Sequence, residues 1–387
     1  MTAGDAVQPP SHPRAPRRFV ALDSLRGFAA CMVVFHHIEG PGLFLGPGLF
    51  LGSALVQEGV YFVDFFFVLS GFVIAANYGD RLREGFPFGR YMLRRLGRVW
   101  PLHLAVLAVL VAAKLASFAL APDSYPNGEA FYGDRSVENL LYATFLLHGW
   151  QEHNGWHTVS WSISIEVFLY LFFALVWRFL GRWGLAVAML GIAYGCAASW
   201  GLMPGNAGIV RGLLGFSAGV LGWHVYRRYF SEIAMSPARA TAWEMLTTVA
   251  MLAAVANLPL VSLPVGVASF MAVVLVYARD RGAISRLLAR PLPVLLGTLS
   301  YSIYMIHSPV LAGARAGLVR IESLAGSRIV EGFTGPVAAD LLALALLAAI
   351  CALSTLSYRF IEAPAREWSR RVAKRMERGP AAHAAGP

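Results

Sequence analysis

Two ionisable residues in the first apolar segment have the types and spacing of a catalytic pair. Arg26 and His37 are eleven residues apart in FVALDSLRGFAACMVVFHH. In an α-helix this spacing is close to three turns, which puts both side chains on one face, about 16 Å apart along the axis. A histidine can move protons near neutral pH, and an arginine binds anions. Either the pair is functional, or Arg26 extends to the headgroups and His37 lies at the membrane interface.

Two carboxylates interrupt later apolar segments. Asp64 and then Ser70 stand in YFVDFFFVLSGF, and Glu166 lies in HTVSWSISIEVFLYL at the depth that we assign to His37. A carboxylate beside a histidine fixes the tautomer of the ring and raises its basicity. Glu166 could instead pair with Arg211 for packing, and a serine followed by glycine in mid-helix is also typical of close helix contacts. Because ionisable groups are costly at membrane depth, each is a candidate functional residue.

A group of arginines precedes Pro101 in RYMLRRLGRVWPLH. Its members are Arg90, Arg94, Arg95 and Arg98. Their three- to four-residue spacing would place them on one helical stripe at the cytoplasmic surface, where they would suit a polyphosphate ligand. Anchoring of the helix by positive charge explains the same pattern.

The remaining candidates are aromatic and imidazole side chains. Tyr304 and His307 are one turn apart in LSYSIYMIH, a pairing compatible with either a structural or a catalytic role. His148, His153 and His157, together with Glu152, fall in the longest predicted outer loop. Their spacing fits no strong metal pattern, so we expect solvated loop residues and no metal site.

The composition indicates which elements must position these residues. Of 387 residues, 57% are hydrophobic and 14% are charged, whereas an ordinary soluble domain has roughly 25% charged residues. This predicts an all-α fold, a polytopic transmembrane helical bundle of about ten helices. The predicted spans are 19–39, 59–79, 98–121, 158–181, 183–203, 207–228, 241–259, 261–279, 292–315 and 335–361.

The distribution of positive charge predicts the orientation of the bundle. With a cytoplasmic N-terminus, 25 of the 32 Lys and Arg residues fall on the cytoplasmic side and four on the other. This asymmetry predicts that both termini are cytoplasmic in a multi-pass protein of the inner or plasma membrane. It also explains the net charge of +10 without nucleic-acid binding. We expect a disordered basic tail at 1–18, a membrane domain at 19–362 and a basic to Ala/Gly-rich cytoplasmic tail at 363–387, without a soluble domain at either end.

Several of these motifs together resemble a known family. FVALDSLRGFAACMVVFHH resembles the signature helix of the acyltransferase-3 family of integral membrane acyltransferases, in which ten residues separate an arginine from a histidine. VDFFFVLSGF and the stretch from Arg94 to Pro101 resemble its next two blocks, although Phe62 stands where the family often has glycine. SWSISIE, SYSIYMIH and YRFIEAPAR resemble later blocks in the same order, so that the resemblance covers about residues 19–366.

The resemblance implies transfer of an acyl group, commonly acetyl, from acyl-CoA to a hydroxyl of a surface polysaccharide or related carbohydrate. Members also act on peptidoglycan and on macrolide-type metabolites. It implies an acetyl-CoA site at the arginine group, with Arg26 as the next cation inward. A multi-helix transporter or flippase of envelope glycoconjugates, or a scaffold in an envelope complex, are the alternatives.

The same resemblance suggests roles for the buried residues. His37 would act as the general base or as the acyl-accepting nucleophile. Glu166 or Asp64 would orient or stabilise its imidazole. The groups expected to bind the oxyanion or the acceptor are Ser70, Tyr304 and His307.

Overall fold

A computed structural model describes residues 17–39, 48–126, 129–150, 155–258, 262–326 and 335–376. All regular structure within these residues is helical, which confirms the predicted all-α class. The helices are α1 (Val20–Glu39), α2 (Ala54–Gln57), α3 (Phe62–Arg83), α4 (Phe88–Leu120), α5 (Val137–Thr144), α6 (Trp161–Leu175), α7 (Gly184–Ser199), α8 (Ala207–Val225), α9 (Pro237–Ala256), α11 (Leu263–Tyr277), α12 (Ala283–Leu288), α13 (Pro291–Ala325), α14 (Pro336–Ser357) and α15 (Ala363–Arg375).

Each of the ten predicted spans overlaps a helix, and the bundle is that of a multi-pass membrane protein. Six helical stretches of the described chain are long and apolar enough to cross a membrane: Gly59–Arg83, Phe88–Leu120, Thr158–Ser199, Ala207–Phe230, Pro291–Leu324 and Pro336–Arg375. Helix α1 is outside this set and carries Asp23, Arg26, His36 and His37 among its apolar residues. Its charged groups are tolerated because it lies inside the bundle rather than against lipid.

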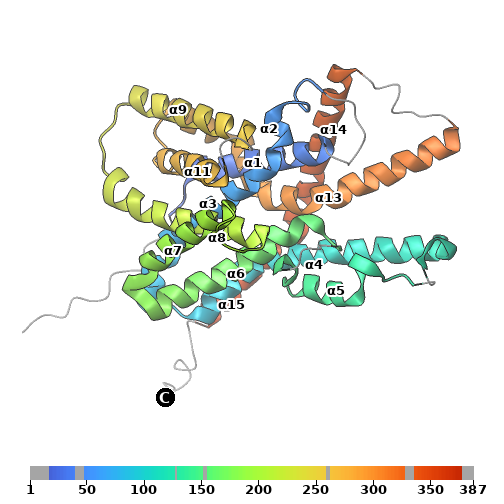
Figure 1. Ribbon diagram of the computed structural model, residues 1–387, viewed down its shortest axis with the longest axis horizontal. Coiled ribbons are helices and arrows are strands. Elements are labelled where there is room, and N and C mark those ends of the chain that lie inside the picture. The colour runs from blue at the N-terminus through green and yellow to red at the C-terminus, as the bar shows by residue number, and fades with distance from the viewer. Residues whose placement is uncertain are drawn as a thin grey trace, which may run out of the picture.

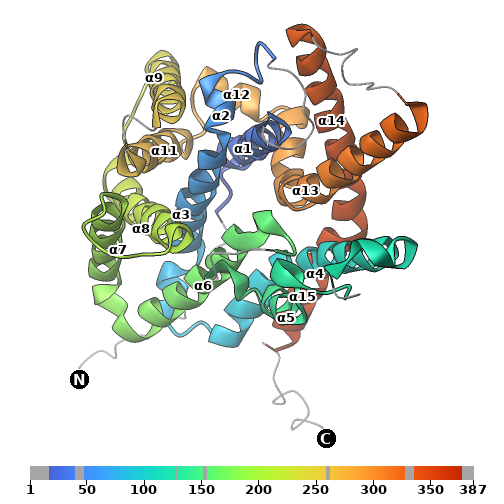
Figure 2. The same cartoon turned by 45° about the vertical axis from the view of Figure 1, so that its right-hand side comes forward.

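Helices α1 and α3 occupy the centre of the molecule (Figures 1 and 2). In both views α7, α8, α9 and α11 lie on one side of them, and α4, α5, α13 and α14 lie on the other. The two central helices carry four of the candidate residues, Arg26 and His37 on α1 and Asp64 and Ser70 on α3. The fold therefore surrounds the polar groups with helices whose outer surfaces are apolar, as the bilayer requires.

A glycine crossing joins α1 to α13. A Cβ at Gly27 would lie 2.5 Å from the backbone nitrogen of Gly297, and one at Gly297 would collide with the carbonyl oxygen of Asp23. Small residues of this kind let two helix backbones approach closely. The two helices run in the same direction, since Arg26 contacts Ser300 and His37 contacts His307. The crossing thereby fixes the position of Arg26 and His37 relative to α13.

A second close crossing joins α3 to α8. A Cβ on Gly71 would collide with the carbonyl oxygen of Phe216, and one on Gly219 with that of Val68. The Ser70-Gly71 step is thus a point of close helix packing, one of the two meanings left open by the sequence. Its serine is nevertheless free to face the interior of the bundle.

Two elements differ from the predicted boundaries. Helix α4 begins at Phe88, ten residues before the predicted span, so the arginines before Pro101 lie on a continuous helix. Residues 363–375, predicted as a tail, form α15. This helix packs on α4 where a Cβ at Gly97 would collide with the Ser369 side chain. The contact brings the basic residues of the two helices to the same place.

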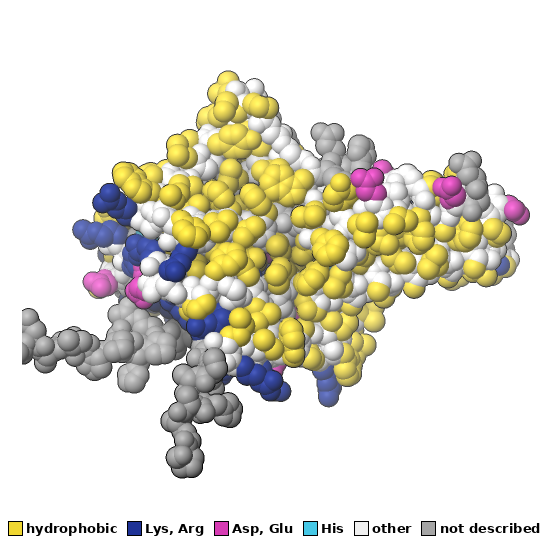
Figure 3. All heavy atoms as spheres, turned by 90° about the horizontal axis from the view of Figure 1, so that it is seen from below, with side chains coloured by type: hydrophobic (Ala, Val, Ile, Leu, Met, Phe, Trp, Pro, Cys, Tyr) yellow, Lys and Arg dark blue, Asp and Glu magenta, His cyan; other side chains and the backbone are white. Residues whose placement is uncertain are grey.

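The surface separates apolar from basic side chains. In Figure 3 hydrophobic side chains cover most of the visible face, and Lys and Arg side chains gather toward its left and lower edges. Arg17 and Lys374, near the two ends of the described chain, line one cavity. These ends therefore lie on the same side of the bundle, which we call the termini side.

Candidate active site

A basic cavity opens on the termini side. This basic vestibule has a volume of about 800 Å³ and is lined by α1, α3, α4, α13 and α15 and by the residues just before α1. Eleven of its lining side chains are basic and two are acidic. The basic ones are Arg17, Arg18, Arg26, Arg81, Arg94, Arg95, Arg98, Arg366, Arg370, Arg371 and Lys374. Such an excess of positive charge attracts a ligand with several phosphates.

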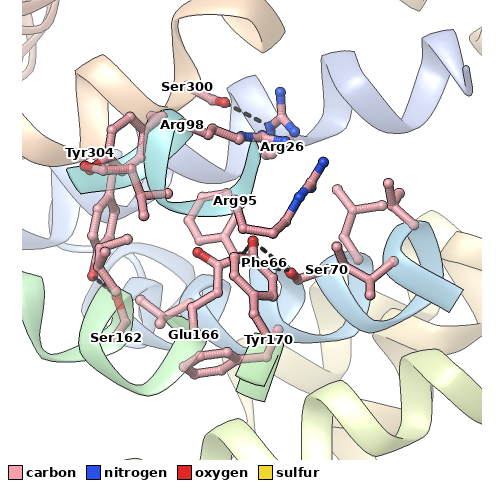
Figure 4. Close-up of a pocket in the computed structure, with 18 residues that line it drawn as sticks. Arg26, Phe66, Ser70, Arg95, Arg98, Ser162, Glu166, Tyr170, Ser300 and Tyr304 are labelled. Atoms are coloured by element: carbon pink, nitrogen blue, oxygen red, sulfur yellow. Dashed lines mark hydrogen bonds between the residues drawn. The ribbon is translucent and has the colours of Figure 1, made fainter. Parts of the chain in front are cut away.

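A smaller cavity lies deeper in the bundle. This inner chamber has a volume of about 80 Å³ and is lined by residues of α1, α3, α4, α6 and α13. Arg26, Arg95 and Arg98 line both the vestibule and the chamber. Figure 4 shows these three side chains on one side of the chamber, with Ser70, Glu166 and Tyr170 on the other. The three arginines thus belong to the walls of both cavities, which adjoin at these side chains.

The three arginines differ in how their guanidinium groups are held. Arg26 donates from Nε to Ser300 Oγ (2.8 Å) and from Nη2 to the Gly297 carbonyl (3.0 Å). Arg95 donates to the Tyr78 hydroxyl (3.2 Å). Arg98 makes no hydrogen bond or ion pair with any other described residue. Its donors are therefore available to a bound molecule.

The other predicted arginines lie further out. Arg94 lines the vestibule and not the chamber. The guanidinium of Arg90 lies 5.4 Å from the centroid of the Phe86 ring, and Arg90 lines neither cavity. The vestibule also includes Arg366, Arg370 and Lys374 of α15, in the segment for which the sequence predicts a tail. Their four-residue spacing, which places them on one helix face, was the available signal.

Glu166 belongs to the chamber but contacts neither of its expected partners. Its Oε1 accepts hydrogen bonds from Ser70 Oγ (2.7 Å) and from the Tyr170 hydroxyl (2.6 Å). It makes no ion pair with Arg211 and no hydrogen bond with His37 in the described structure. Tyr170 lies four residues further along the same helix, so α6 itself holds the carboxylate in place.

Asp64 is also bonded to a residue other than His37. It is fully buried and receives hydrogen bonds on both oxygens from Arg211 of α8, the shortest at 2.7 Å. The guanidinium of Arg211 also lies 5.2 Å from the ring centroids of Tyr61 and Trp161. A bidentate pair of this geometry satisfies both charges. The expectation that Asp64 orients His37 is therefore corrected, because its carboxylate neutralises Arg211.

Two of the three residues predicted to bind the oxyanion or the acceptor, Ser70 and Tyr304, line the chamber, and the hydroxyl hydrogen of each is already donated to an acceptor. Ser70 donates to Glu166, as described above. The Tyr304 hydroxyl donates to the Val159 carbonyl (2.7 Å) and lies 2.8 Å from Ser162 Oγ. Neither hydroxyl can donate to a new oxygen without losing a present acceptor. Among the chamber residues, Arg98 is the better placed donor.

His37 and His307 lie together just beyond the chamber. Their ring centroids are 4.8 Å apart, and neither ring lines the chamber. Tyr304 does line it, and its ring centroid lies 5.8 Å from that of His307. His37 is half-buried, whereas His307 is fully buried. Arg26 therefore lies on the vestibule side of the chamber, and His37 lies past Tyr304, as their separation along α1 requires.

The outer-loop histidines do not behave as predicted. His148 and His157 are buried beside His103 of α4, with ring centroids 5.8 Å and 6.3 Å from that ring, whereas His153 and Glu152 lie outside the described residues. Burial, reinforced by the neighbouring His103, lowers the pKa of His148 to about 4 and that of His157 to about 3. The expectation of solvated residues was wrong because this loop folds back onto α4 and α6. No group of three metal-ligating side chains with suitable geometry occurs in the described residues.

Comparison with known proteins identifies one family and two partial relatives. The family model described as an acyltransferase domain, Acyl_transf_3, matches residues 19–358. The chain is 36% identical over 106 residues to "Protein 2 in picA locus" of Rhizobium radiobacter, which is 27% of this chain and 50% of that protein. It is 32% identical over 171 residues to "Acyltransferase MdmB" of Streptomyces mycarofaciens, which is 42% of this chain and 41% of that protein. The chain thus matches half or less of the length of these relatives, and no solved structure matches it.

Proposed function

Because the chain belongs to the acyltransferase-3 family of membrane acyltransferases, we propose that it moves an acetyl group from acetyl-CoA to a hydroxyl of a surface carbohydrate. The observation that carries the proposal is that Arg26, Arg95 and Arg98 line both the basic vestibule and the inner chamber. One elongated molecule can therefore place anionic groups in the vestibule and a small reactive end in the chamber. Coenzyme A, with three phosphates at one end and a thioester at the other, has this form.

The size of the chamber favours a short acyl group. Its volume of about 80 Å³ is room for a handful of water molecules, at roughly 10–15 Å³ each on the same measure. An acetyl group fits in this space, whereas a long fatty acyl chain does not. We therefore assign the phosphates to the vestibule, the thioester to the chamber and its carbonyl oxygen to the uncommitted guanidinium of Arg98.

The proposed reaction uses His37 as the general base. Its Nδ1 lies 2.8 Å from the Val33 carbonyl, so the hydrogen is on Nδ1 and Nε2 carries the lone pair. The Nε2 atom takes the proton from the acceptor hydroxyl, and the hydroxyl oxygen attacks the thioester carbon. We place this attack beside Tyr304, at the end of the chamber nearest to His37. The CoA thiolate then leaves and takes up the proton. The acceptor approaches from the side opposite the termini, which we place outside the cytoplasmic membrane.

The test is acetyl transfer by the purified protein in lipid nanodiscs, with radiolabelled acetyl-CoA and a panel of methyl glycosides as acceptors. His37→Ala should lower the transfer rate by about 10²-fold or more at unchanged affinity for acetyl-CoA. Arg98→Ala should raise the KM for acetyl-CoA by about 10-fold or more and also lower kcat, because it removes charge-assisted hydrogen bonds to the thioester oxygen in both the bound substrate and the transition state.

The matched control is Arg228→Ala, which removes an arginine that lines neither cavity. It should leave the KM for acetyl-CoA unchanged. Full transfer by His37→Ala at normal protein levels would overturn the role of His37. Equal KM values for Arg98→Ala and Arg228→Ala would overturn the donor site.

A further inference from the structure

The rings of His37 and His307 are brought together by the glycine crossing of α1 and α13. Each histidine lies ten residues beyond its glycine, Gly27 in α1 and Gly297 in α13. Because the two helices run in the same direction from this crossing, the two rings meet, with centroids 4.8 Å apart and planes inclined by 62°. The pairing is therefore a consequence of backbone packing and not of one flexible side chain.

Hydrogen bonds to main-chain carbonyls fix the tautomer of both rings. His37 Nδ1 lies 2.8 Å from the Val33 carbonyl oxygen, and His307 Nδ1 lies 2.7 Å from that of Tyr304. A carbonyl oxygen only accepts, so each Nδ1 carries a hydrogen. In both neutral rings the lone pair is consequently on Nε2.

The second nitrogen of His307 has no partner. This ring is fully buried, and its Nε2 makes no hydrogen bond within the described residues. Buried polar atoms without a partner are rare and call for an explanation. The ionisable groups that face the pair are His36 on α1, with its ring centroid 5.2 Å from that of His37, His157 near His307, and Tyr304. No carboxylate bonds either ring in the described structure.

We propose that His307 is the positioning residue of His37, and that its Nε2 accepts a hydrogen bond from the Nε2–H that His37 gains during acyl transfer. The inference rests on the proposed role of His37 as the base. The hydroxyl O–H bond breaks and its proton binds His37 Nε2, while the oxygen forms the bond to the acyl carbon. The C–S bond breaks, the thiolate leaves with the electron pair, and the proton finally goes to its sulfur. His307 stays neutral and accepts a hydrogen bond from the new Nε2–H of His37 after the acceptor oxygen has left that nitrogen, whereas the carboxylate of a Ser-His-Asp triad bonds the nitrogen opposite the reacting one.

Two substitutions of His307 separate this role from a structural one. His307→Leu fills the space without an acceptor, whereas His307→Gln places an amide oxygen near the former Nε2. We expect His307→Leu to lower kcat for acetyl transfer by about 10- to 100-fold with little change in KM, because it removes a hydrogen bond to a charged group. The acid limb of its pH–rate profile should move to lower pH, since His37 then holds a proton less well. His307→Gln should retain most of the rate and the original profile.

Two results would overturn the inference. One is an unchanged rate and pH profile in His307→Leu. The other is an equal loss in both variants with the wild-type pH profile, which is the signature of a packing role.

A second readout needs no enzymatic activity. Diethyl pyrocarbonate modifies unprotonated imidazole, and peptide mass spectrometry of the full chain reports the modification of His37 as a function of pH. The midpoint should move to lower pH in His307→Leu and stay in place in His307→Gln, with His224 of α8 as the internal control. A shift in a protein that transfers no acetyl would mean that the proposed function fails and the pairing holds. Normal acetyl transfer without the shift would mean that the proposed function holds and the pairing of His37 with His307 fails.

Discussion

At the residue scale, the carboxylates of Asp64 and Glu166 are each held by hydrogen-bond donors of the bundle. Arg211 of α8 neutralises Asp64 of α3, and Glu166 of α6 receives two hydroxyl hydrogens. Of the three arginines that line both cavities, only Arg98 makes no hydrogen bond or ion pair with another described residue. The distinction separates charges that stabilise the fold from the arginine that we assign to the thioester of the substrate.

The ion pair between α3 and α8 should be essential for stability. Asp64→Asn leaves the buried Arg211 charge uncompensated, which costs about 3–5 kcal/mol in the free energy of unfolding. Chemical unfolding of the detergent-solubilised protein measures this loss, and Asp64→Asn with Arg211→Gln should recover part of it. Asp80→Asn, which removes exposed pairs with Arg83 and Arg227, should cost at most about 1 kcal/mol. An Asp64→Asn protein as stable as the Asp80→Asn protein would contradict the assignment.

The buried outer-loop histidines should make the protein sensitive to acid. The pKa of His157 is lowered by burial to about 3, against about 6.5 in the unfolded chain. Between these values the unfolded chain binds more protons, so stability falls as the pH drops below about 6.5. His157→Gln should therefore lose less melting temperature between pH 7.5 and pH 5 than the wild type. Identical decreases in the two proteins would show that His157 does not titrate on unfolding.

At the element scale, apolar runs were sufficient to predict the helices but not their partners. Each of the ten predicted spans overlaps a helix because a membrane helix needs a long apolar stretch that is visible in the sequence. The partner of Asp64 was not predictable, since the α3–α8 crossing depends on glycines far apart in the chain. Helix α15 was missed because its basic residues also suit a tail. The burial of His148 and His157 depends on a loop that folds back, which no local pattern indicates.

The α1–α13 crossing should be sensitive to a single methyl group. Gly297→Ala places a Cβ against the Asp23 carbonyl, so the helices must separate and the alignment of Arg26 and His37 with α13 is lost. We expect a loss of stability of about 1–3 kcal/mol and a fall in acetyl transfer. The control is Gly317→Ala on the same helix, where a Cβ meets nothing within 4 Å and the change should be neutral or stabilising. Equal behaviour of the two variants in thermal unfolding would contradict the close crossing.

At the scale of the whole molecule, the proposed reaction gives the two substrates separate approaches. The vestibule opens on the termini side, whereas His37 lies beyond the chamber, toward the opposite side. The positive charges predict that the termini side is cytoplasmic. A cytoplasmic donor and an external acceptor could then react without either crossing the membrane.

This orientation can be measured by labelling single cysteines in intact cells, after replacement of Cys31, Cys196 and Cys351. Arg135→Cys, before α5, should react with a membrane-impermeant maleimide from outside. Lys374→Cys, in the vestibule, should react only after permeabilisation. The opposite pattern would reverse the orientation of the bundle and of the proposed donor site.

The most direct test of the central claim uses proteoliposomes in which the protein has one orientation. Radiolabelled acetyl-CoA is supplied on the termini side alone, and methyl glycosides on the other side alone. Acetylated glycoside should then accumulate on the glycoside side with stoichiometric release of CoA on the termini side, and Arg98→Ala should suppress both. Transfer only when acetyl-CoA is on the glycoside side, or no CoA release from either side, would contradict the account.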